Sequence, residues 1–235
     1  MATNKSGSTA PKKRPNARAE ARKAAERKQR IILVVVGVVV VVLAIVIGLL
    51  TARDSGERAD IPTMDDVARD VEVSGEGFPP HDAEGEDPAV GQPTPQVVGE
   101  DFDGTSVEIG GPGRPQLVTF AASWCPACQE ELPSLTTWLN EGNLPDEVDL
   151  VMVSTNHDRG RGNWPPQDWF EEEAYPGPIL VDDASSSAAA AYGLSGTPFW
   201  VAIDGDGALV WRGSGMISMA QLSDLADQLA ENPSS

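Results

Sequence analysis

Two cysteines are the residues of this chain whose type and spacing most directly suggest chemistry. Cys125 and Cys128 are the two cysteines among 235 residues, and they stand three positions apart in the run SWCPACQEELP. A thiolate attacks a disulfide to form a mixed disulfide, and a second thiol nearby releases it. The sequence carries no nucleotide, flavin or metal motif, so the spacing predicts a catalytic pair whose own disulfide is the redox centre, without another cofactor.

The pair is expected where a strand meets a helix. An apolar run at residues 116–121 precedes it, and a helical pattern at residues 126–140 follows. If Cys125 is the N-cap and Pro126 the first helical residue, the free N–H groups and the helix dipole favour a thiolate on Cys125. Cys128, one turn further on, is then the predicted resolving thiol.

Other uses of two cysteines fit the sequence less well. A zinc site needs about four ligands, and the two histidines, His81 and His157, lack zinc-site spacing. Covalent haem attachment needs a histidine after the second cysteine, where this chain has Gln129. A structural disulfide stays open as an alternative, although so small a loop contributes little through chain entropy.

The elements that must position the pair begin near Val97, where short apolar runs alternate with turn residues. Strands are expected at residues 96–109, as a hairpin turning near Asp103-Gly104, and at 116–121, 148–154, 179–181, 199–203 and 208–212. Helices are expected at residues 126–140, within 162–174, and at 184–192 and 218–231. This order predicts an α/β domain with a mixed sheet covered by helices.

Three motifs in this region are shared with a known family. The run LVTFAASWCPAC, the Glu131-Leu132-Pro133 that follows and the later Gly196-Thr197-Pro198 resemble the thioredoxin superfamily. The resemblance is specifically to its membrane-anchored, extracytoplasmic TlpA/ResA-like thiol-disulfide oxidoreductases, and it covers about residues 97–231. It implies a thioredoxin-like fold with an N-terminal β-hairpin and an inserted helical element at residues 156–176.

The resemblance also implies roles for residues around the pair. Trp124 would flank the active site, and Thr197 and Pro198 would form a cis peptide facing the sulfurs. Together with Pro126, these residues are predicted to bind the substrate. Glu131 resembles a family glutamate three residues after the second cysteine, which would tune the proton of Cys128. A solvated acid on the helix surface stays an alternative for Glu131.

The sequence departs from thioredoxin itself at two places near the pair. Thioredoxin has a buried acid six residues before the first cysteine, whereas this chain has Thr119, which cannot act as a base. The dipeptide Pro126-Ala127 lacks the proline that thioredoxin places before its second cysteine. These differences leave the reduction potential open.

An apolar run follows the chain's basic N-terminal arm. Residues 1–30 hold ten Lys and Arg against two acids, and residues 31–50 are 20 consecutive apolar residues. At about 1.5 Å per residue, a helix of this length spans about 30 Å of hydrocarbon. We expect a transmembrane helix there, with the basic arm in the cytoplasm and everything after Thr51 outside. A cleaved signal peptide stays an alternative.

The stretch between this run and the domain is acidic and rich in Pro and Gly. Residues 51–96 contain little apolar material to bury, so we expect a disordered tether there, followed by a domain at residues 97–235. From residue 31 onward the chain has seven Arg against 34 acids and no Lys. Nucleic acid is therefore not an expected partner of the exported part, because phosphate binding relies on clustered Lys and Arg.

The function predicted from these features is thiol-disulfide exchange with exported proteins at the cell membrane. The resemblance implies a reductase that receives electrons from a membrane partner, and apocytochrome c is the substrate that such anchored relatives commonly reduce. Two alternatives stay open. One is a disulfide-forming oxidase for secreted proteins, and the other is a non-redox module that binds partner peptides in the same groove.

Overall fold

The computed structural model describes residues 27–28, 33–46, 61–82 and 84–231. The chain divides into two units, Met1–Asp60 and Ile61–Ser235. In the first unit, residues 33–46 form a helix with exposed side chains. Among the residues described, no helix has the length and apolar character needed to cross a membrane. The predicted membrane segment at residues 31–50 extends beyond the described residues at both ends.

The centre of the second unit is a five-stranded mixed sheet. Its strands are β4 (Gln116–Ala121), β5 (Asp149–Ser154), β6 (Ile179–Val181), β7 (Phe199–Ile203) and β8 (Leu209–Ser214), in the order β6-β5-β4-β7-β8. Strands β4, β5 and β6 run parallel, and β7 and β8 are antiparallel to their neighbours. The predicted α/β domain with a mixed sheet is confirmed.

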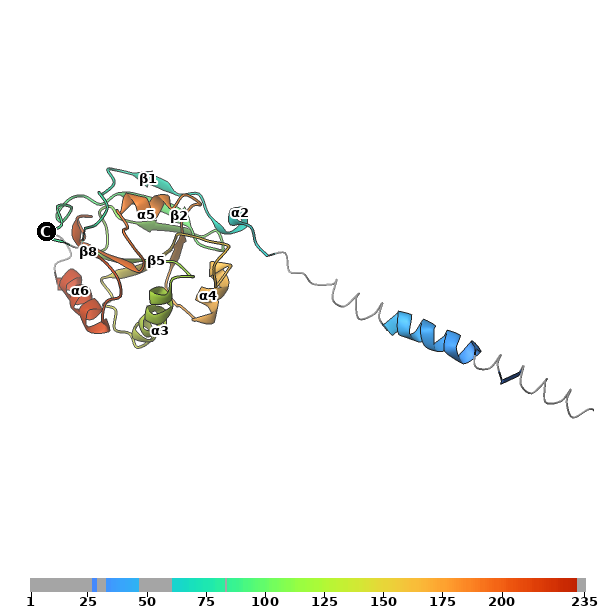
Figure 1. The fold of residues 1–235 in the computed structure, drawn as a ribbon. Coiled ribbons are helices and arrows are strands. Elements are labelled where there is room, and N and C mark those ends of the chain that lie inside the picture. The colour runs from blue at the N-terminus through green and yellow to red at the C-terminus, as the bar shows by residue number, and fades with distance from the viewer. Residues whose placement is uncertain (1–26, 29–32, 47–60, 83, 232–235) are drawn as a thin grey trace, which may run out of the picture. The chain divides into compact units, whose positions relative to one another are not determined.

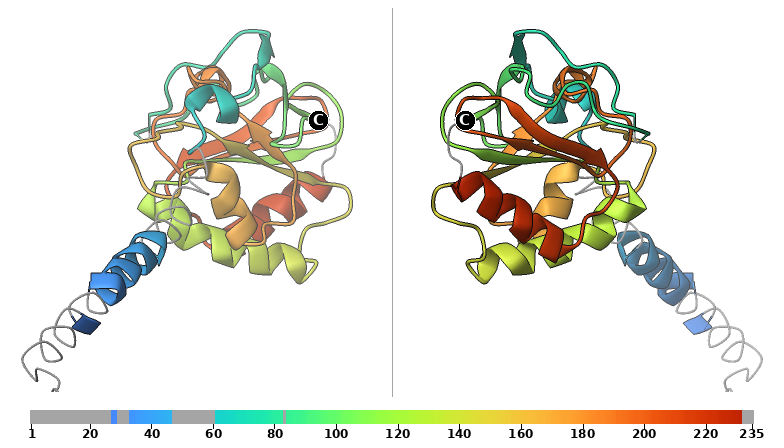
Figure 2. Two further views of the ribbon diagram at one scale, coloured as in Figure 1. Left: turned by 90° about the vertical axis from the view of Figure 1, so that its right-hand side faces the viewer. Right: turned by 90° about the vertical axis from the view of Figure 1, so that its left-hand side faces the viewer.

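Helices cover both faces of this sheet, as Figures 1 and 2 show. The helices α3 (Pro126–Asn140), α4 (Pro166–Glu172) and α6 (Met219–Glu231) lie on one face, and α5 (Ser187–Ala191) lies on the other. Alternation along β4 explains the two layers: Leu117 and Ala121 belong to the apolar cluster under α3, whereas Val118 and Phe120 belong to the cluster under α5.

A second, three-stranded sheet lies on the same side as α5. It consists of β1 (Glu72–Ser74), β2 (Gln96–Glu100) and β3 (Ser106–Ile109), paired antiparallel in the order β1-β2-β3. The predicted hairpin at residues 96–109 is confirmed, with its turn between β2 and β3. Strand β1 was not predicted, because its three residues are all exposed and carry no alternating apolar pattern.

Residues 61–95, which we call the N-terminal strap, are part of the folded unit. The prediction of a disordered tether at residues 51–96 was therefore wrong for this stretch. The folded unit begins at Ile61 rather than at residue 97, and the strap includes the helix α2 (Met64–Val67). The composition of the strap did not indicate a folded segment because it contains few apolar residues. Two of them, Phe78 and Ala89, are nevertheless buried in the cluster under α5. The remaining tether residues, 51–60, lie outside the described residues.

A buried ion pair fastens the strap to the sheet. The Arg212 side chain, 1% exposed, donates Nε–H to Oδ2 of Asp87 at 2.6 Å and Nη2–H to Oδ1 at 3.1 Å. Its Nη1 donates to the carbonyl oxygens of Tyr192 at 2.7 Å and Pro79 at 3.1 Å. One guanidinium on β8 thus joins two segments of the strap to the domain. We call these segments, residues 75–79 and residues 87–94, the two arms of the strap.

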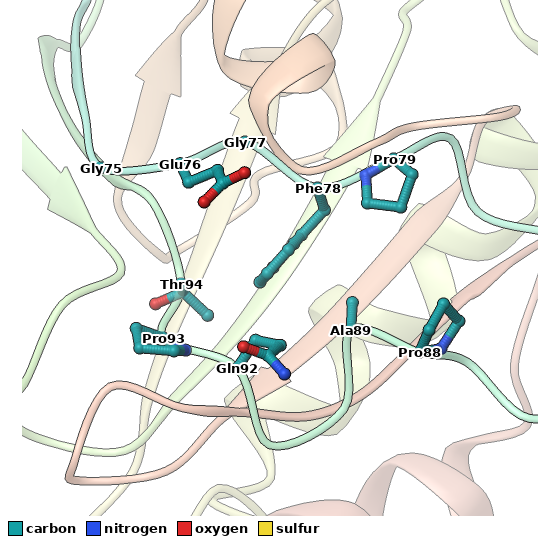
Figure 3. Close-up of a pocket in the computed structure, with 10 residues that line it drawn as sticks. All are labelled: Gly75, Glu76, Gly77, Phe78, Pro79, Pro88, Ala89, Gln92, Pro93 and Thr94. Atoms are coloured by element: carbon teal, nitrogen blue, oxygen red, sulfur yellow. The ribbon is translucent and has the colours of Figure 1, made fainter.

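The two arms of the strap enclose a pocket of about 440 Å³, shown in Figure 3. The Phe78 side chain points between the arms, with the Glu76 carboxylate on one arm and the Gln92 amide on the other. Phe78 belongs to the cluster under α5, whereas Cys125 and Cys128 belong to the cluster under α3. The pocket is therefore not the site of the thiols.

We predict that Asp87→Ala lowers the free energy of unfolding by about 3–5 kcal/mol, because it leaves the Arg212 guanidinium buried without its counter-ion. Urea denaturation of the wild-type and variant proteins measures the difference. The matched control is Asp149→Ala, which removes the carboxylate from Arg114, a side chain that is 55% exposed. That loss is expected to stay below about 1 kcal/mol, and equal losses in the two variants would contradict the prediction.

Candidate active site

The start of α3 places the two cysteines as the sequence predicts. Cys125 is the N-cap, with φ −78° and ψ 120°, and Pro126 occupies the first helical position. The Cys125 carbonyl oxygen accepts the Gln129 N–H at 3.0 Å, which begins the helical hydrogen bonding. Strand β4 ends at Ala121, so the pair lies at the junction between a buried strand and a helix.

The segment before β7 approaches the first thiol. The Cys125 Sγ–H donates to the Thr197 carbonyl oxygen at 3.2 Å, and the Thr197–Pro198 peptide bond is cis, as the family resemblance implies. Pro198 is buried, Trp124 and Thr197 are half-buried, and Pro126 is exposed. The structure therefore brings the predicted substrate-binding residues together around Cys125.

The two thiols have opposite proton affinities. Burial by itself would raise the pKa of Cys125, but hydrogen bonds from the Thr197 side chain and from the Cys128 and Ala127 backbone hold it below the ordinary value. Burial raises the pKa of Cys128 to about 12, and the neighbouring Cys125 adds to that shift. The Cys125 thiol therefore ionises at a lower pH than the Cys128 thiol.

Glu131 is buried on the same helix, so the alternative of a solvated acid is wrong. The residue is 7% exposed, and burial raises the pKa of its carboxyl group to about 7, while hydrogen bonds from Ile217 and Trp200 act in the opposite direction. Oε1 accepts the Ile217 backbone N–H at 2.9 Å, and the two oxygens accept the Trp200 Nε1–H at 3.1 and 3.2 Å.

Glu131 lies one turn of α3 after Cys128. The two residues stand three positions apart, so both side chains leave α3 on the same face. The hydrogen bonds of Glu131 nevertheless run to β7 and to the segment before α6, not to either sulfur. Trp200 and Ile217 could not be predicted as its partners, because both contacts span more than 65 residues.

A loop between β5 and α4 holds the residues just before Cys125. The Trp124 Nε1–H donates to the Asn156 carbonyl oxygen at 2.7 Å, and the Arg161 guanidinium carbon lies 4.0 Å from the centre of the Trp124 ring. The Asn163 side-chain amide donates to the Ser123 carbonyl oxygen at 3.0 Å. Sequence reasoning missed these contacts, since Asn156, Arg161 and Asn163 belong to no recognisable motif.

The aromatic residues of the inserted element contribute mainly to packing. Trp169 and Phe170 on α4 are each 3% exposed and join the cluster under α3. The Trp164 Nε1–H donates to the Pro62 carbonyl oxygen at 2.8 Å, so this side chain connects the loop to the start of the strap.

His157 lies in the same loop and is largely shielded from solvent. Burial lowers its pKa to about 4, and Nε2 lies 3.1 Å from Oγ of Ser154. Among the residues that the structure describes, no group of three or more His, Cys, Asp or Glu side chains is arranged to hold a metal ion.

Comparison with known sequences identifies the family. The sequence model of the Redoxin family matches residues 89–229, which is more than half of the chain. The chain belongs to the Redoxin family. This redoxin is a thiol-disulfide oxidoreductase of the thioredoxin superfamily.

Curated relatives match this redoxin at modest identity. The methylamine utilization protein MauD of Methylophilus methylotrophus is 27% identical over 129 residues, which cover 54% of this chain and 56% of that protein. The thiol:disulfide interchange protein DsbE of Pseudomonas aeruginosa is 27% identical over 125 residues, covering 52% and 64%. DsbE of Escherichia coli K12 is 26% identical over 143 residues, covering 57% and 72%. The match thus spans less than two thirds of the first two relatives.

Solved structures also resemble this redoxin. StoA from Bacillus subtilis matches with a TM-score of 0.49 and 22% identity, over 59% of this chain and 98% of that one. DsbF of MTB, solved in mixed oxidised and reduced forms, matches with a TM-score of 0.46 and 22% identity, over 56% and 93%.

We predict that the two thiols differ in their reactivity with iodoacetamide. In a Cys128→Ser variant, Cys125 should be alkylated with a pH midpoint below 9, because its pKa is lowered. In a Cys125→Ser variant, Cys128 should react little until the pH approaches its pKa of about 12. Mass spectrometry of samples quenched at increasing pH measures both profiles, and coincident profiles would contradict the assignment of the attacking thiol.

We predict that Glu131→Gln flattens the pH dependence of stability. A carboxyl group whose pKa rises from 4.5 to about 7 on folding stabilises the fold fully below pH 4.5, and this contribution decreases as the pH rises through 7. The decrease amounts to at most about 1.4 kcal/mol per pH unit. Urea denaturation of the reduced proteins between pH 5 and 8 measures it.

The comparison must be made between wild type and variant at each pH. His157, whose pKa is lowered to about 4, acts with the opposite sign, since its contribution is complete above pH 6.5 and is lost as the pH falls toward 4. The stability of Glu131→Gln relative to wild type should therefore rise with pH. A constant difference from pH 5 to 8 would show that Glu131 does not titrate in this range.

Proposed function

We propose that this redoxin reduces disulfides of exported proteins by dithiol-disulfide exchange through Cys125 and Cys128. The observation that carries the proposal is the unequal state of the two thiols at the start of α3. One has a lowered pKa and a position at the helix N-cap, and the other is 2% exposed with a pKa raised to about 12. An attacking thiol and a resolving thiol need these two environments.

The proposed exchange proceeds in two steps, and each step conserves atoms and electrons. The Cys125 thiolate attacks one sulfur of the partner's disulfide, an S–S bond forms between the two proteins, and the partner's other sulfur leaves as a thiolate that takes up a proton. Cys128 then loses its proton and attacks the Cys125 sulfur, which breaks the mixed disulfide and releases the partner's second thiol. Two electrons pass to the partner, and a Cys125–Cys128 disulfide remains.

Glu131 is the group proposed to receive the proton of Cys128 in the second step. A pKa near 7 lets the carboxyl group hold or release a proton close to neutral pH. Its Ile217 and Trp200 hydrogen bonds favour the charged form, whereas burial favours the neutral form. The carboxyl group is thus poised between both states.

The direction of exchange and the partners are inferred from the relatives and from the charge of the folded unit. DsbE relatives are named thiol:disulfide interchange proteins, and the family resemblance favours a reductase that acts on apocytochrome c. A membrane partner would return electrons to the Cys125–Cys128 disulfide. Residues 61–231 contain five Arg against 31 acids, a charge that steers positively charged partners toward the domain.

The cellular location belongs to the same proposal. The apolar segment at residues 31–50 would anchor the chain in the cell membrane as a single span, with the basic residues 1–30 on the cytoplasmic side. The folded unit from Ile61 would then lie outside the cytoplasm, where exported proteins carry disulfides.

The proposal is tested by the reduction potential of the full-length protein, equilibrated with defined glutathione ratios and followed by the fluorescence of Trp124. We expect a value near −270 mV, as for a reductase. A value near −120 mV would instead assign disulfide formation in secreted proteins. A pair that does not cycle would reject the exchange and leave a binding module.

Two variants separate the roles of the thiols. Cys125→Ser should abolish reduction of a disulfide substrate, because the attacking sulfur is gone. Cys128→Ser should accumulate the mixed disulfide, which non-reducing electrophoresis detects, because the resolving thiol is gone. Full activity of Cys125→Ser would show that another mechanism operates.

A further inference from the structure

Positive charge is rare in the folded unit, and two of its five arginines lie in the loop beside Trp124. Of the five Arg at residues 61–231, three have partners elsewhere: Arg69 bonds to backbone carbonyl groups, Arg114 to Asp149 and Arg212 to Asp87. The other two, Arg159 and Arg161, both lie in the loop that holds Trp124. A protein that docks beside Trp124 therefore meets cationic side chains on a folded unit whose net charge is strongly negative.

Arg161 is held in place by the residue next to the attacking thiol. Its guanidinium carbon lies 4.0 Å from the centre of the Trp124 ring, a distance at which cation and ring attract each other. The ring is itself fixed, because Nε1–H donates to the Asn156 carbonyl oxygen at 2.7 Å. The guanidinium thus lies against a ring of fixed position, on the residue that precedes Cys125.

Most of the hydrogen-bonding capacity of this guanidinium is available. Nε–H donates to Oδ2 of Asp158 at 3.1 Å, and within the described part of the chain Asp158 is its single hydrogen-bond partner. A guanidinium has five N–H donors, and the Arg161 side chain is 55% exposed. Asp158 is also held by the Gly160 N–H at 2.9 Å, so its position is set by the loop.

We propose that Arg161 is a specificity residue that binds a carboxylate of the partner protein next to the partner's reacting cysteine. The inference rests on the proposed exchange function and deepens it by naming the chemistry of the docking sequence. Arginine pairs with carboxylates through two parallel hydrogen bonds. The folded unit holds 31 acids against five Arg, so few other places on it attract a carboxylate, and the pairing therefore fixes the orientation of the partner.

The partner thus needs two charge features at different ranges. The acidic domain attracts a protein of net positive charge from a distance, and Arg161 accepts an acidic residue at close contact. A lysine in the same place would meet a cation held on Trp124 and be disfavoured. The order of preference for the residue beside the partner's cysteine is acid, then neutral, then base.

The test uses three peptides with one cysteine each, presented as disulfide-linked dimers, in which the residue beside the cysteine is Asp, Asn or Lys and a residue at the far end is changed to keep the net charge equal. Second-order rate constants for reduction by the full-length reduced protein are measured at low ionic strength. We expect the Asp peptide to react about twofold to fivefold faster than the Asn peptide, as for a partly exposed ion pair, and the Lys peptide to react more slowly than both.

Arg161→Gln should bring the ratio of the Asp and Lys rates close to one, and Arg161→Glu should invert it. The matched control is Arg159→Gln, which removes the same charge two positions before Arg161. The Arg159 side chain bonds to the Ile61 carbonyl oxygen and does not stack on Trp124. This variant should keep most of the preference. Equal losses in Arg159→Gln and Arg161→Gln would overturn the proposal in favour of a general charge effect.

The Asn peptide separates the two proposals. If the wild-type protein reduces all three peptides at the same rate, the exchange function stands and the specificity role of Arg161 is overturned. If the wild-type protein does not reduce the Asn peptide at all, the exchange function fails and the role of Arg161 fails with it.

Discussion

The chemistry of this protein depends on where α3 begins. Pro126 at the first helical position makes Cys125 the N-cap and leaves Cys128 one turn inside the helix. That single boundary divides two chemically identical side chains into a thiol beside free backbone N–H groups and a thiol enclosed by the core. A helix beginning one turn later would leave both cysteines in the loop and remove the difference on which a directed two-step exchange depends.

The rest of the fold keeps this boundary in place from several directions. Strand β4 delivers the chain to the cysteines, the segment before β7 supplies the Thr197 carbonyl group, and the loop after β5 supplies contacts to Ser123 and Trp124. Behind α3, the Glu131 carboxylate joins the helix to Trp200 and Ile217. The site is therefore assembled from segments that are distant in sequence, each fixed by one or two hydrogen bonds.

The sequence predicted those features that local patterns encode. The strand at 116–121, the helix at 126–140 and the hairpin at 96–109 follow from alternation, capping and turn residues, and the cis bond at Pro198 followed from the family resemblance. The N-terminal strap could not be predicted, because its order depends on the Asp87–Arg212 pair, whose members stand 125 positions apart. The partners of Glu131 and the position of Arg161 escaped prediction for the same reason, since both depend on tertiary contacts.

The first residues of the strap lie against the loop between β5 and α4. The Ile61 and Pro62 carbonyl oxygens accept hydrogen bonds from Arg159 and Trp164, and Asn163, next to Trp164, bonds to Ser123. The chain therefore enters the domain beside the active site. A change at Ile61 or Pro62 therefore acts on the loop that holds Trp124, so the first residues of the folded unit and the surroundings of Cys125 are structurally linked.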